Sequence, residues 1–498
     1  MTVRRNILAS WMAHLVTLVV GLFLVRYVKD TLGDEGYGAW ILVNSIAGYT
    51  GLLYAGFGAA ICRYTAKYHT SQDWTALNQT ASSIFTVYAA NSLLCVVGAI
   101  ALAYFAPSIS DWEGETITDV RMTMLIIGVA AMVGMLGSVF GGILIGVHRF
   151  DIKRTIQIAG TIGRLLLVVV LLYWKPGLVS MAVSFLCVNI GENLAYYLCA
   201  RRAVPQLRVS VWGARRDVYA ETLPFVGWNA LSMISEYLIY LTDTVVIGCY
   251  LGSAAVTPYY IALRLCQMMR LPLDHVAEAA LPKAGELHTL GKREELHRLI
   301  VQTFGLAFVL IGGFFVGSWY FGERVLTTWL GTGNEASVPI LLLLVGAQLV
   351  AVPCNVLKKI LMGSGQVRGP ATLDLIQAVL NLVLSLILIR SWGVIGVAWG
   401  TLIPILLIEL TMLVPYAARQ FGFPLWQLLM RSLLPQIPIL AALIFYSDAV
   451  SRLPLGMHWF ALLGIAMGGG GVFVGSWWAT RYIQRFVSSS RRPIPDAS

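Results

Sequence analysis

The amino-acid sequence predicts an all-α polytopic membrane protein with about fourteen transmembrane helices. The chain of 498 residues is 58% hydrophobic, has a mean hydropathy of +0.75, and has only 12% charged residues. A soluble protein has about 25% charged residues. Here the apolar residues come in runs of roughly twenty, the length that a helix needs to cross ~30 Å of hydrocarbon. The runs are continuously apolar rather than alternating, which excludes a transmembrane β-barrel.

The apolar runs form two groups of six predicted spans and a final pair. The first six are Ile7–Val28, Gly38–Ile61, Thr80–Phe105, Met122–Val147, Ile156–Trp174 and Leu178–Ala200. The second six are Thr222–Tyr250, Thr257–Leu281, Leu299–Phe321, Ser337–Met362, Leu373–Ile389 and Gly393–Tyr416. The final pair is Leu428–Phe445 and His458–Thr480. We expect the first span to be retained, because it is too long for a cleaved signal peptide and no small-x-small cleavage site follows it.

Positive charge gathers in the loops on the side of the N-terminus. Those loops hold Arg63, Lys67, Arg149, Lys153, Arg154, Arg201, Arg202, Arg208, Arg215, Arg216, Lys358, Lys359, Arg368, Arg481, Arg485, Arg491 and Arg492. Loops on the opposite side are acidic, as in Ser110–Asp119. The positive-inside rule therefore places both termini in the cytoplasm. We interpret the net charge of +10 as a topology signal and a contact with anionic lipid headgroups. Nucleic acid is not an expected partner, because the sequence predicts no compact soluble domain to bind it.

No catalytic or cofactor motif is recognisable in the sequence. Seven cysteines lie in or at the edges of the predicted spans and form no CxxC pair, so neither a disulfide framework nor a zinc site is predicted. The sequence has no Ser/His/Asp or HExxH arrangement with recognisable spacing and no nucleotide-binding motif. We therefore expect a protein that is not an enzyme and that needs no cofactor or metal.

The two groups of six spans are related by a weak internal repeat. Leu32-Gly33 aligns with Leu251-Gly252 at a separation of 219 residues, and Ile143–Gly146 aligns with Ile360–Gly363 at a separation of 217. Because each group has an even number of spans, we expect both to have the same orientation and to be related by a pseudo-twofold axis along the membrane normal. The predicted organisation is an N-terminal lobe (1–205), a C-terminal lobe (206–420), two additional helices (421–480) and a basic cytoplasmic tail (481–498).

The stretch DTLGDEGYGAW, Asp30–Trp40, lies between the first two predicted spans. Gly33, Gly36 and Gly38 permit a tight reversal with positive φ, and Tyr37 and Trp40 suit the membrane–water interface. A phosphate-binding loop would need a GxGxxG or GxxxxGKS/T pattern, and neither is present. We predict a solvated external hairpin.

Three segments carry a resemblance to a known family. RYVKDTLGDEGYGAW, Arg26–Trp40, resembles the LG-x-E-x-YG hairpin of the polysaccharide and oligosaccharide flippases, the Wzx-type branch of the multidrug/oligosaccharidyl-lipid/polysaccharide exporter superfamily. YTGLLYAGFGAAICRYTAKY, Tyr49–Tyr68, is similar to the second span of that family. DTVVIGCYLGSAAVTPYYIALRL, Asp243–Leu265, is similar to the matching hairpin of the second half. With two lobes and an extra pair of spans, the resemblance covers nearly the whole chain.

The resemblance implies a flippase of the cytoplasmic (inner) membrane with a MATE-like fold. Its substrate would be an undecaprenyl-diphosphate-linked oligosaccharide, moved to the outer leaflet by alternating access during the biosynthesis of an exopolysaccharide or O-antigen. A proton or sodium gradient is a candidate for the coupled energy source. Polysaccharide polymerase and export proteins are the implied partners, together with membrane lipids. The open alternatives are a lipid II flippase and a cation-coupled multidrug antiporter of the same superfamily. A membrane glycosyltransferase or polymerase is disfavoured, because it would need large external loops.

Polar residues form one helical face in the seventh predicted span. They are Asn229, Ser232, Glu236, Tyr240 and Asp243, at steps of three, four, four and three residues. The repeat maps this face onto a stripe of the first span that includes His14. Such a face either lines a water-filled cavity or makes interhelical hydrogen bonds, and the sequence leaves both open. Glu236 and Asp243 are candidates for ion coupling, because a carboxylate in a low-dielectric cavity can carry a proton. Hydrogen bonding to the sugar is their alternative role.

Arginines in or beside the spans are the candidate ligands of the substrate pyrophosphate, because guanidinium groups bind concentrated negative charge through two N–H donors at once. Arg264 and Arg270 in the eighth span are the leading candidates, although Arg270 is also spaced to pair with Asp274. Arg26 and Arg63 come next. Both are also placed to snorkel towards a headgroup region or to follow the positive-inside bias.

Further polar residues are candidates for binding sugar hydroxyl groups, because their side chains can both donate and accept hydrogen bonds. They are His14, Asn44, Asn91, Asn189 and Asn381, and Asn229 is a further candidate for substrate binding. Buried polar side chains of this kind also join helices to one another, so a structural role is the alternative for each.

Overall fold

A computed structural model describes residues 2–54, 56–110, 112, 114–422, 424–454, 456 and 458–489. For residues 2–15, 114–115, 216, 221–232, 236, 240, 425 and 481–489 it describes the backbone alone. These ranges form helices and connecting turns and contain no β-strand. The predicted all-α fold class is confirmed. The chain divides into a first unit, Met1–Tyr260 with Ile389–Gly393, and a second unit, Ile261–Leu388 with Val394–Ser498. The predicted lobe boundaries at 205 and 420 stay predictions.

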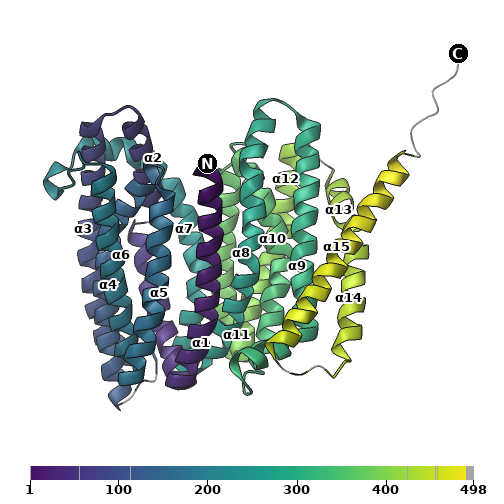
Figure 1. The fold of residues 1–498 in the computed structure, drawn as a ribbon, viewed down its shortest axis with the longest axis horizontal. Coiled ribbons are helices and arrows are strands. Elements are labelled where there is room, and N and C mark those ends of the chain that lie inside the picture. The colour runs from purple at the N-terminus through teal and green to yellow at the C-terminus, as the bar shows by residue number, and fades with distance from the viewer. Residues whose placement is uncertain are drawn as a thin grey trace. The chain divides into compact units, whose positions relative to one another are not determined.

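The first unit is a bundle built from α1 to α7 (Figure 1). Its long helices are α1 (Thr2–Gly48), α3 (Trp74–Phe105), α4 (Gly114–Gly146), α5 (Phe150–Trp174), α6 (Leu178–Ala203) and α7 (Arg216–Leu251). The shorter elements are α2 (Phe57–Thr70) and three 3-10 turns, η1 (Tyr49–Tyr54), η2 (Ala106–Ser108) and η3 (Val211–Gly213). Helix α4 packs against both α3 and α6, and α1 packs against both α5 and α7.

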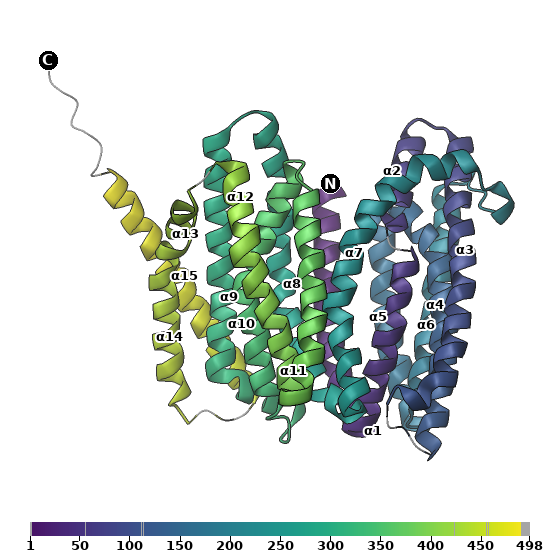
Figure 2. The same cartoon turned by 180° about the vertical axis from the view of Figure 1, so that it is seen from behind.

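The second unit is a bundle built mainly from α8 to α15, seen from the other side in Figure 2. Its helices are α8 (Ser253–Thr289), α9 (Arg293–Leu330), α10 (Ser337–Gly363), α11 (Arg368–Ile408), α12 (Val414–Phe421), α13 (Leu425–Leu433), α14 (Ile437–Ser451) and α15 (Trp459–Ser489). A π-helix, η4 (Glu409–Leu413), joins α11 to α12, and a 3-10 turn, η5 (Leu434–Gln436), joins α13 to α14. The predicted basic tail beyond Ser489 lies outside the described residues.

Ten helical segments of the described chain are long and apolar enough to cross a membrane. The longest, Arg368–Phe421, contains two predicted spans that are separated at Gly393, where φ is 57°. Helix α8 has 37 residues but is not among the ten, because polar and charged residues interrupt it. The chain is therefore a multi-pass membrane protein with at least one long helix that is too polar to face lipid on all sides.

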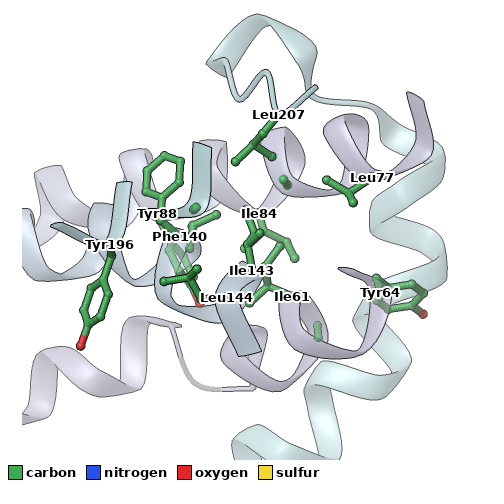
Figure 3. Close-up of a cluster of buried hydrophobic side chains, with 14 of the residues drawn as sticks. Ile61, Tyr64, Leu77, Ile84, Tyr88, Phe140, Ile143, Leu144, Tyr196 and Leu207 are labelled. Carbon is green, nitrogen blue, oxygen red and sulfur yellow. The ribbon is translucent and has the colours of Figure 1, made fainter. Parts of the chain in front are cut away.

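A cluster of buried hydrophobic side chains holds α2, α3, α4 and α6 together, and Figure 3 shows these side chains pointing toward one another. Ile61, Ile84, Ile143 and Leu144 are each at most 1% exposed. Small residues let these helices approach closely: a Cβ atom added at Gly142 of α4 would meet Ile61. Within hydrocarbon such close packing, rather than removal from water, is what favours helix association.

The predicted hairpin is present within α1, where the chain reverses at Gly33. Of its three glycines Gly33 alone has a positive φ, 71°, a conformation that costs glycine little. Gly38 has a different role, because a Cβ atom there would collide with the backbone carbonyl of Ser253 at the start of α8. The carbonyl group of Asp34 accepts a hydrogen bond from Thr257 Oγ1 at 2.6 Å. The hairpin is thus packed against α8.

The predicted second span, Gly38–Ile61, is not one continuous helix. Helix α1 ends at Gly48, η1 follows, and α2 begins only after Gly56, whose φ is 82°. A left-handed glycine and a 3-10 turn end the α-helical hydrogen bonding, so the freed backbone groups need other partners. The Asn91 side chain of α3 donates a hydrogen bond to the Leu53 carbonyl in this segment. The continuous span predicted from hydropathy is therefore corrected to two helices with a polar break.

Gly38→Ala is expected to destabilise the first unit, because the new methyl group would overlap the Ser253 carbonyl oxygen. Overpacking of this kind costs about 1–3 kcal/mol. Thermal unfolding of the purified chain in detergent measures the effect. Gly98→Ala in α3 is the matched control, because a Cβ atom there meets nothing within 4 Å. Equal losses of stability in both variants would contradict the close-packing explanation.

Candidate functional site: buried charges in two helical units

Asp243 is a buried carboxylate of the first unit. It lies in α7, is 2% exposed, and accepts a hydrogen bond at Oδ2 from Tyr259 Oη of α8 at 2.6 Å. A buried carboxylate is costly unless it is hydrogen-bonded or carries a proton. The tyrosine hydroxyl supplies one such bond and fixes the orientation of the carboxylate.

The neighbours of Asp243 in the chain join α7 to α1 and η1. Thr242 Oγ1 lies 2.5 Å from Tyr49 Oη, and Thr244 Oγ1 donates to Ser45 Oγ at 3.0 Å. Small residues allow the close approach: Cβ atoms added at Gly48, Gly51 and Gly248 would meet Leu241, Tyr237 and Leu42 respectively. At this end of α7 the polar side chains therefore make interhelical hydrogen bonds.

The rest of the predicted polar face of α7 lies where the structure describes the backbone alone. Its members there are Asn229, Ser232, Glu236 and Tyr240. The choice between cavity lining and interhelical hydrogen bonding stays open for these four side chains, and so does the role of Glu236 in ion coupling.

Arg264 and Arg270 lie on α8 in the second unit. Arg270 Nε is 3.2 Å from Asp274 Oδ2, and the two side chains are 24% and 28% exposed. Asp274 Oδ1 also accepts a hydrogen bond from Asn355 Nδ2 of α10 at 2.9 Å. The ion pair anticipated from the spacing is present. Arg264 is partly buried, and within the described ranges no carboxylate pairs with it.

A second buried ion cluster joins α10 to α11 and η4. Lys358 Nζ lies 2.5 Å from Asp374 Oδ1 and 2.5 Å from Glu409 Oε1. The side chains of Lys358 and Glu409 are 14% and 2% exposed. The sequence groups Lys358 with the headgroup-facing loop residues, and the structure corrects that assignment. One ammonium group thus binds carboxyl groups of two different elements.

These two ion clusters share one face of α10. Asn355 and Lys358 are three residues apart, so their side chains lie on the same side of the helix. Together the two clusters contain six residues, for which we use the name α10 polar seam. These residues are Arg270, Asp274, Asn355, Lys358, Asp374 and Glu409. The seam connects α8, α10, α11 and η4. An acid inside an apolar span, such as Glu409, is the sequence signal that points to such a cluster.

The two remaining arginine candidates are exposed to a larger degree. Arg26 in α1 is 50% exposed, and its Nε lies 3.6 Å from Asp30 Oδ2. Arg63 on α2 is exposed, with its guanidinium carbon 5.9 Å from the centre of the Tyr64 ring. Both positions suit a snorkelling side chain.

The predicted sugar ligands are described only in part. Asn44 Nδ2 donates to the carbonyl of Trp40 in its own helix at 2.8 Å. The side chains of His14 and Asn229 lie outside the described residues. In the described part of the chain, no group of three or more His, Cys, Asp and Glu side chains is arranged to hold a metal ion.

Ionisable side chains buried inside long apolar helices, together with a broken helix, are typical of membrane transporters. The fold and these sites therefore define the chain as a membrane transport protein. Residues 3–288 match the family model described as "Polysaccharide biosynthesis protein". This is more than half of the chain, and the chain belongs to that family. Residues 229–387 also match the family model MatE.

Relatives and a solved structure agree with this membership. The chain is 21% identical over 433 residues to the "Uncharacterized membrane protein EpsK" of Bacillus subtilis, covering 84% of this chain and 83% of that one. It is 21% identical over 394 residues to the "Probable flippase AglR" of Haloferax volcanii, with 78% of each chain covered. It superimposes on the lipid II flippase MurJ, inward closed, with a TM-score of 0.74 at 14% identity, covering 97% of this chain and 99% of that one. At such low identity the superposition shows the fold alone. The resemblance drawn from the hairpin segments is confirmed.

Lys358→Met is expected to destabilise the second unit by about 3–5 kcal/mol, because it leaves Asp374 and Glu409 without their shared cation. The measurement is thermal unfolding of the purified chain. The double variant Lys358→Met/Glu409→Gln is expected to regain part of the loss, since it also removes the more deeply buried charge. Lys359→Met, which removes the same charge one residue further along α10, is the control and is expected to have a smaller effect. A Lys358→Met variant as stable as the parent would show that the cluster does not hold these helices together.

Proposed function

We propose that the protein is a flippase that carries a lipid-linked oligosaccharide across the cytoplasmic membrane for the biosynthesis of a surface polysaccharide. The observation that carries this proposal is the match of residues 3–288 to the polysaccharide biosynthesis family. The flippase name of the Haloferax volcanii relative supports transport rather than sugar polymerisation. The fold shared with MurJ is compatible with a large lipid-linked substrate.

The lipid carrier in this proposal is undecaprenyl diphosphate, whose two phosphate groups bring concentrated negative charge into the transport path. Arg264 on α8 is partly buried, where charge-assisted hydrogen bonds are stronger than in water. Arg270 is held by Asp274, and Asp274 is itself held by a hydrogen bond from Asn355. Arg26 and Arg63 are secondary contacts for the same headgroup.

Transport would proceed by alternating access, the mode of transporters built from repeated helical halves. The breaks at Gly33, η1 and Gly393 are the points at which helices of this chain change direction, and such points absorb backbone rotation during conformational change. Both termini would lie in the cytoplasm. Polymerase and export proteins would then act on the oligosaccharide after it reaches the outer leaflet.

Energy coupling to a proton or sodium gradient is assigned to Asp243 and Glu236. Asp243 is the described member of this pair, buried and held by the Tyr259 hydroxyl. A carboxylate in this setting changes its preferred partner when its protonation or ion binding changes. Because Asp243 lies between two residues that bond α7 to α1 and η1, its state can bias the packing of those elements.

A cation-coupled drug antiporter is the less favoured function. Its substrates are cationic, whereas the partly buried candidate on α8, Arg264, has no carboxylate partner among the described residues. A cation would be repelled by such a guanidinium group, and an anion would be attracted. A lipid II flippase shares the anionic diphosphate, so the two are separated by a transport assay with both substrates.

Arg264→Ala is expected to abolish surface-polysaccharide production in a deletion strain while the protein remains in the membrane. Loss of a hydrogen bond to a charged group weakens the binding free energy by about 1.5–3 kcal/mol, which lowers the affinity for the substrate roughly 10–150-fold. Arg264→Lys keeps the charge without the planar fork, and we expect partial activity. Arg298→Ala, which removes an exposed arginine of α9, is the control. Full complementation by Arg264→Ala would remove this residue from substrate binding.

Asp243→Asn is expected to slow transport in reconstituted vesicles and to remove its dependence on an imposed proton or sodium gradient. Tyr259→Phe deletes the hydrogen bond at Asp243 Oδ2 but keeps the carboxylate. We expect that variant to be slower yet still gradient-dependent. If the transport rate of Asp243→Asn depends on the imposed gradient as strongly as that of the parent protein, Asp243 is excluded from coupling.

A further inference from the structure

Arg164 and Glu192 are two charged side chains within the apolar helices of the first unit. Arg164 lies near the middle of α5 and Glu192 near the middle of α6, and both helices are long and apolar enough to cross a membrane. Each side chain is partly exposed rather than buried. A charge at this depth faces the interior of the bundle or a water-filled space rather than hydrocarbon. Their partial exposure therefore indicates that water reaches both side chains.

The guanidinium group of Arg164 has no acceptor for its N–H groups among the described residues. Its Nε atom is buried without a hydrogen-bond partner. Its guanidinium carbon lies 4.9 Å from the centre of the Phe185 ring of α6. An aromatic ring supports a guanidinium group through its face and uses none of the N–H donors. The five N–H groups of this arginine are therefore positioned by the ring and remain available.

The carboxylate of Glu192 lies against Gly160 of α5. A Cβ atom added at Gly160 would lie 1.6 Å from Glu192 Oε1, so the carboxylate occupies the space that a side chain would fill. Gly160 is one helical turn before Arg164, and the two charges interact electrostatically. Within the described part of the chain they form no direct ion pair, and Glu192 accepts no hydrogen bond. The two charged groups are therefore neighbours that do not touch.

A ligand of this pair needs both a hydrogen-bond donor and an acceptor. An anion would be attracted by Arg164 and repelled by Glu192, and the reverse holds for a cation. A hydroxyl group suits both side chains, because its oxygen accepts from the guanidinium group and its O–H donates to the carboxylate. Adjacent hydroxyl groups of a sugar ring offer such donors and acceptors side by side. The pair therefore favours a neutral ligand that carries hydroxyl groups, and a charged diphosphate is a poor match.

We propose that Arg164 and Glu192 form a subsite for a neutral sugar unit of the transported oligosaccharide. Arg164 donates N–H groups to one hydroxyl oxygen, and Glu192 accepts the O–H of the same or the adjacent hydroxyl group. Phe185 supports the guanidinium group, and Gly160 leaves the space for the carboxylate. This inference rests on the proposed function. It concerns the uncharged part of the substrate, whereas Arg264 binds the diphosphate in that proposal.

Saturation-transfer difference NMR tests the subsite on the full chain, purified in a detergent without a sugar headgroup. The neutral probes are glucose, galactose, mannose and N-acetylglucosamine, with glucuronate as an anionic sugar and glucosamine as a cationic one. We expect a neutral sugar to give a signal that exceeds those of both charged sugars. Arg164→Met and Glu192→Met are each expected to weaken the affinity for that sugar roughly 10–150-fold, the effect of one hydrogen bond to a charged group.

Further variants separate sugar binding from a structural role of the pair. Arg164→Met/Glu192→Met leaves no unpaired charge between the helices, so we expect it to fold as the parent does and still to lose sugar binding. Gly160→Ala keeps both charges but displaces the Glu192 carboxylate, and we expect weaker binding. Gly163→Ala, where an added Cβ atom meets nothing within 4 Å, is the matched control. Thermal unfolding checks that each variant is folded.

The subsite is overturned if no neutral sugar binds to the parent protein, or if a charged sugar binds as well as the neutral ones. It is also overturned if the folded double variant and Gly160→Ala bind the sugar as the parent does, which would mean that water alone bridges the pair. Transport of a lipid-linked oligosaccharide by the parent is measured separately. A parent that binds a neutral sugar through this pair but transports no such substrate would overturn the proposed function and not the sugar site.

Discussion

A charge inside a membrane protein must be neutralised or hydrogen-bonded by the protein itself, and this constraint decides how the second unit is built. Lys358 meets it by lying between Asp374 and Glu409. Because the two acids come from α11 and η4, one ammonium group joins three consecutive elements of the bundle. Asn355 lies on the same face of α10 and reaches Asp274 of α8. The α10 polar seam thus gives specific partners to helices that apolar packing alone would allow to slide.

The same constraint acts on the backbone of the first unit. Between α1 and α2 the helix is interrupted, and the carbonyl of Leu53 takes its hydrogen bond from the Asn91 side chain. The hydroxyl pairs at Thr242 and Thr244 bind η1 and the end of α1, the elements before that break, to α7. Interruptions of this kind persist at membrane depth only where protein surrounds them. The break in the second span and the buried carboxylate of Asp243 therefore belong to one arrangement.

Local sequence patterns predicted the parts of this structure that depend on local physics. Continuous hydropathy predicted an all-α membrane fold, and the glycines of Asp30–Trp40 predicted the reversal that occurs at Gly33. The pairing of Arg270 with Asp274 followed from helical spacing alone. The cluster at Lys358 could not be predicted in the same way, since its acids lie 16 and 51 residues away along the chain. Nor does hydropathy report the break before α2, because η1 (YTGLLY) contains no charged residue that would interrupt the predicted span.

The arginines of the second unit show that the role of an arginine side chain depends on the residues around it more than on its being an arginine. Arg270 is half of an ion pair, so its charge is largely compensated before any substrate arrives. Arg264, six residues earlier on the same helix, is partly buried, and no carboxylate of the described residues pairs with it. Arg368 and Arg419 are exposed and line a groove together with apolar side chains. The same guanidinium group therefore lies in three different settings: paired with a carboxylate at Arg270, without a described carboxylate partner at Arg264, and exposed at Arg368 and Arg419. The surroundings of each arginine, rather than its residue type, decide what it can bind.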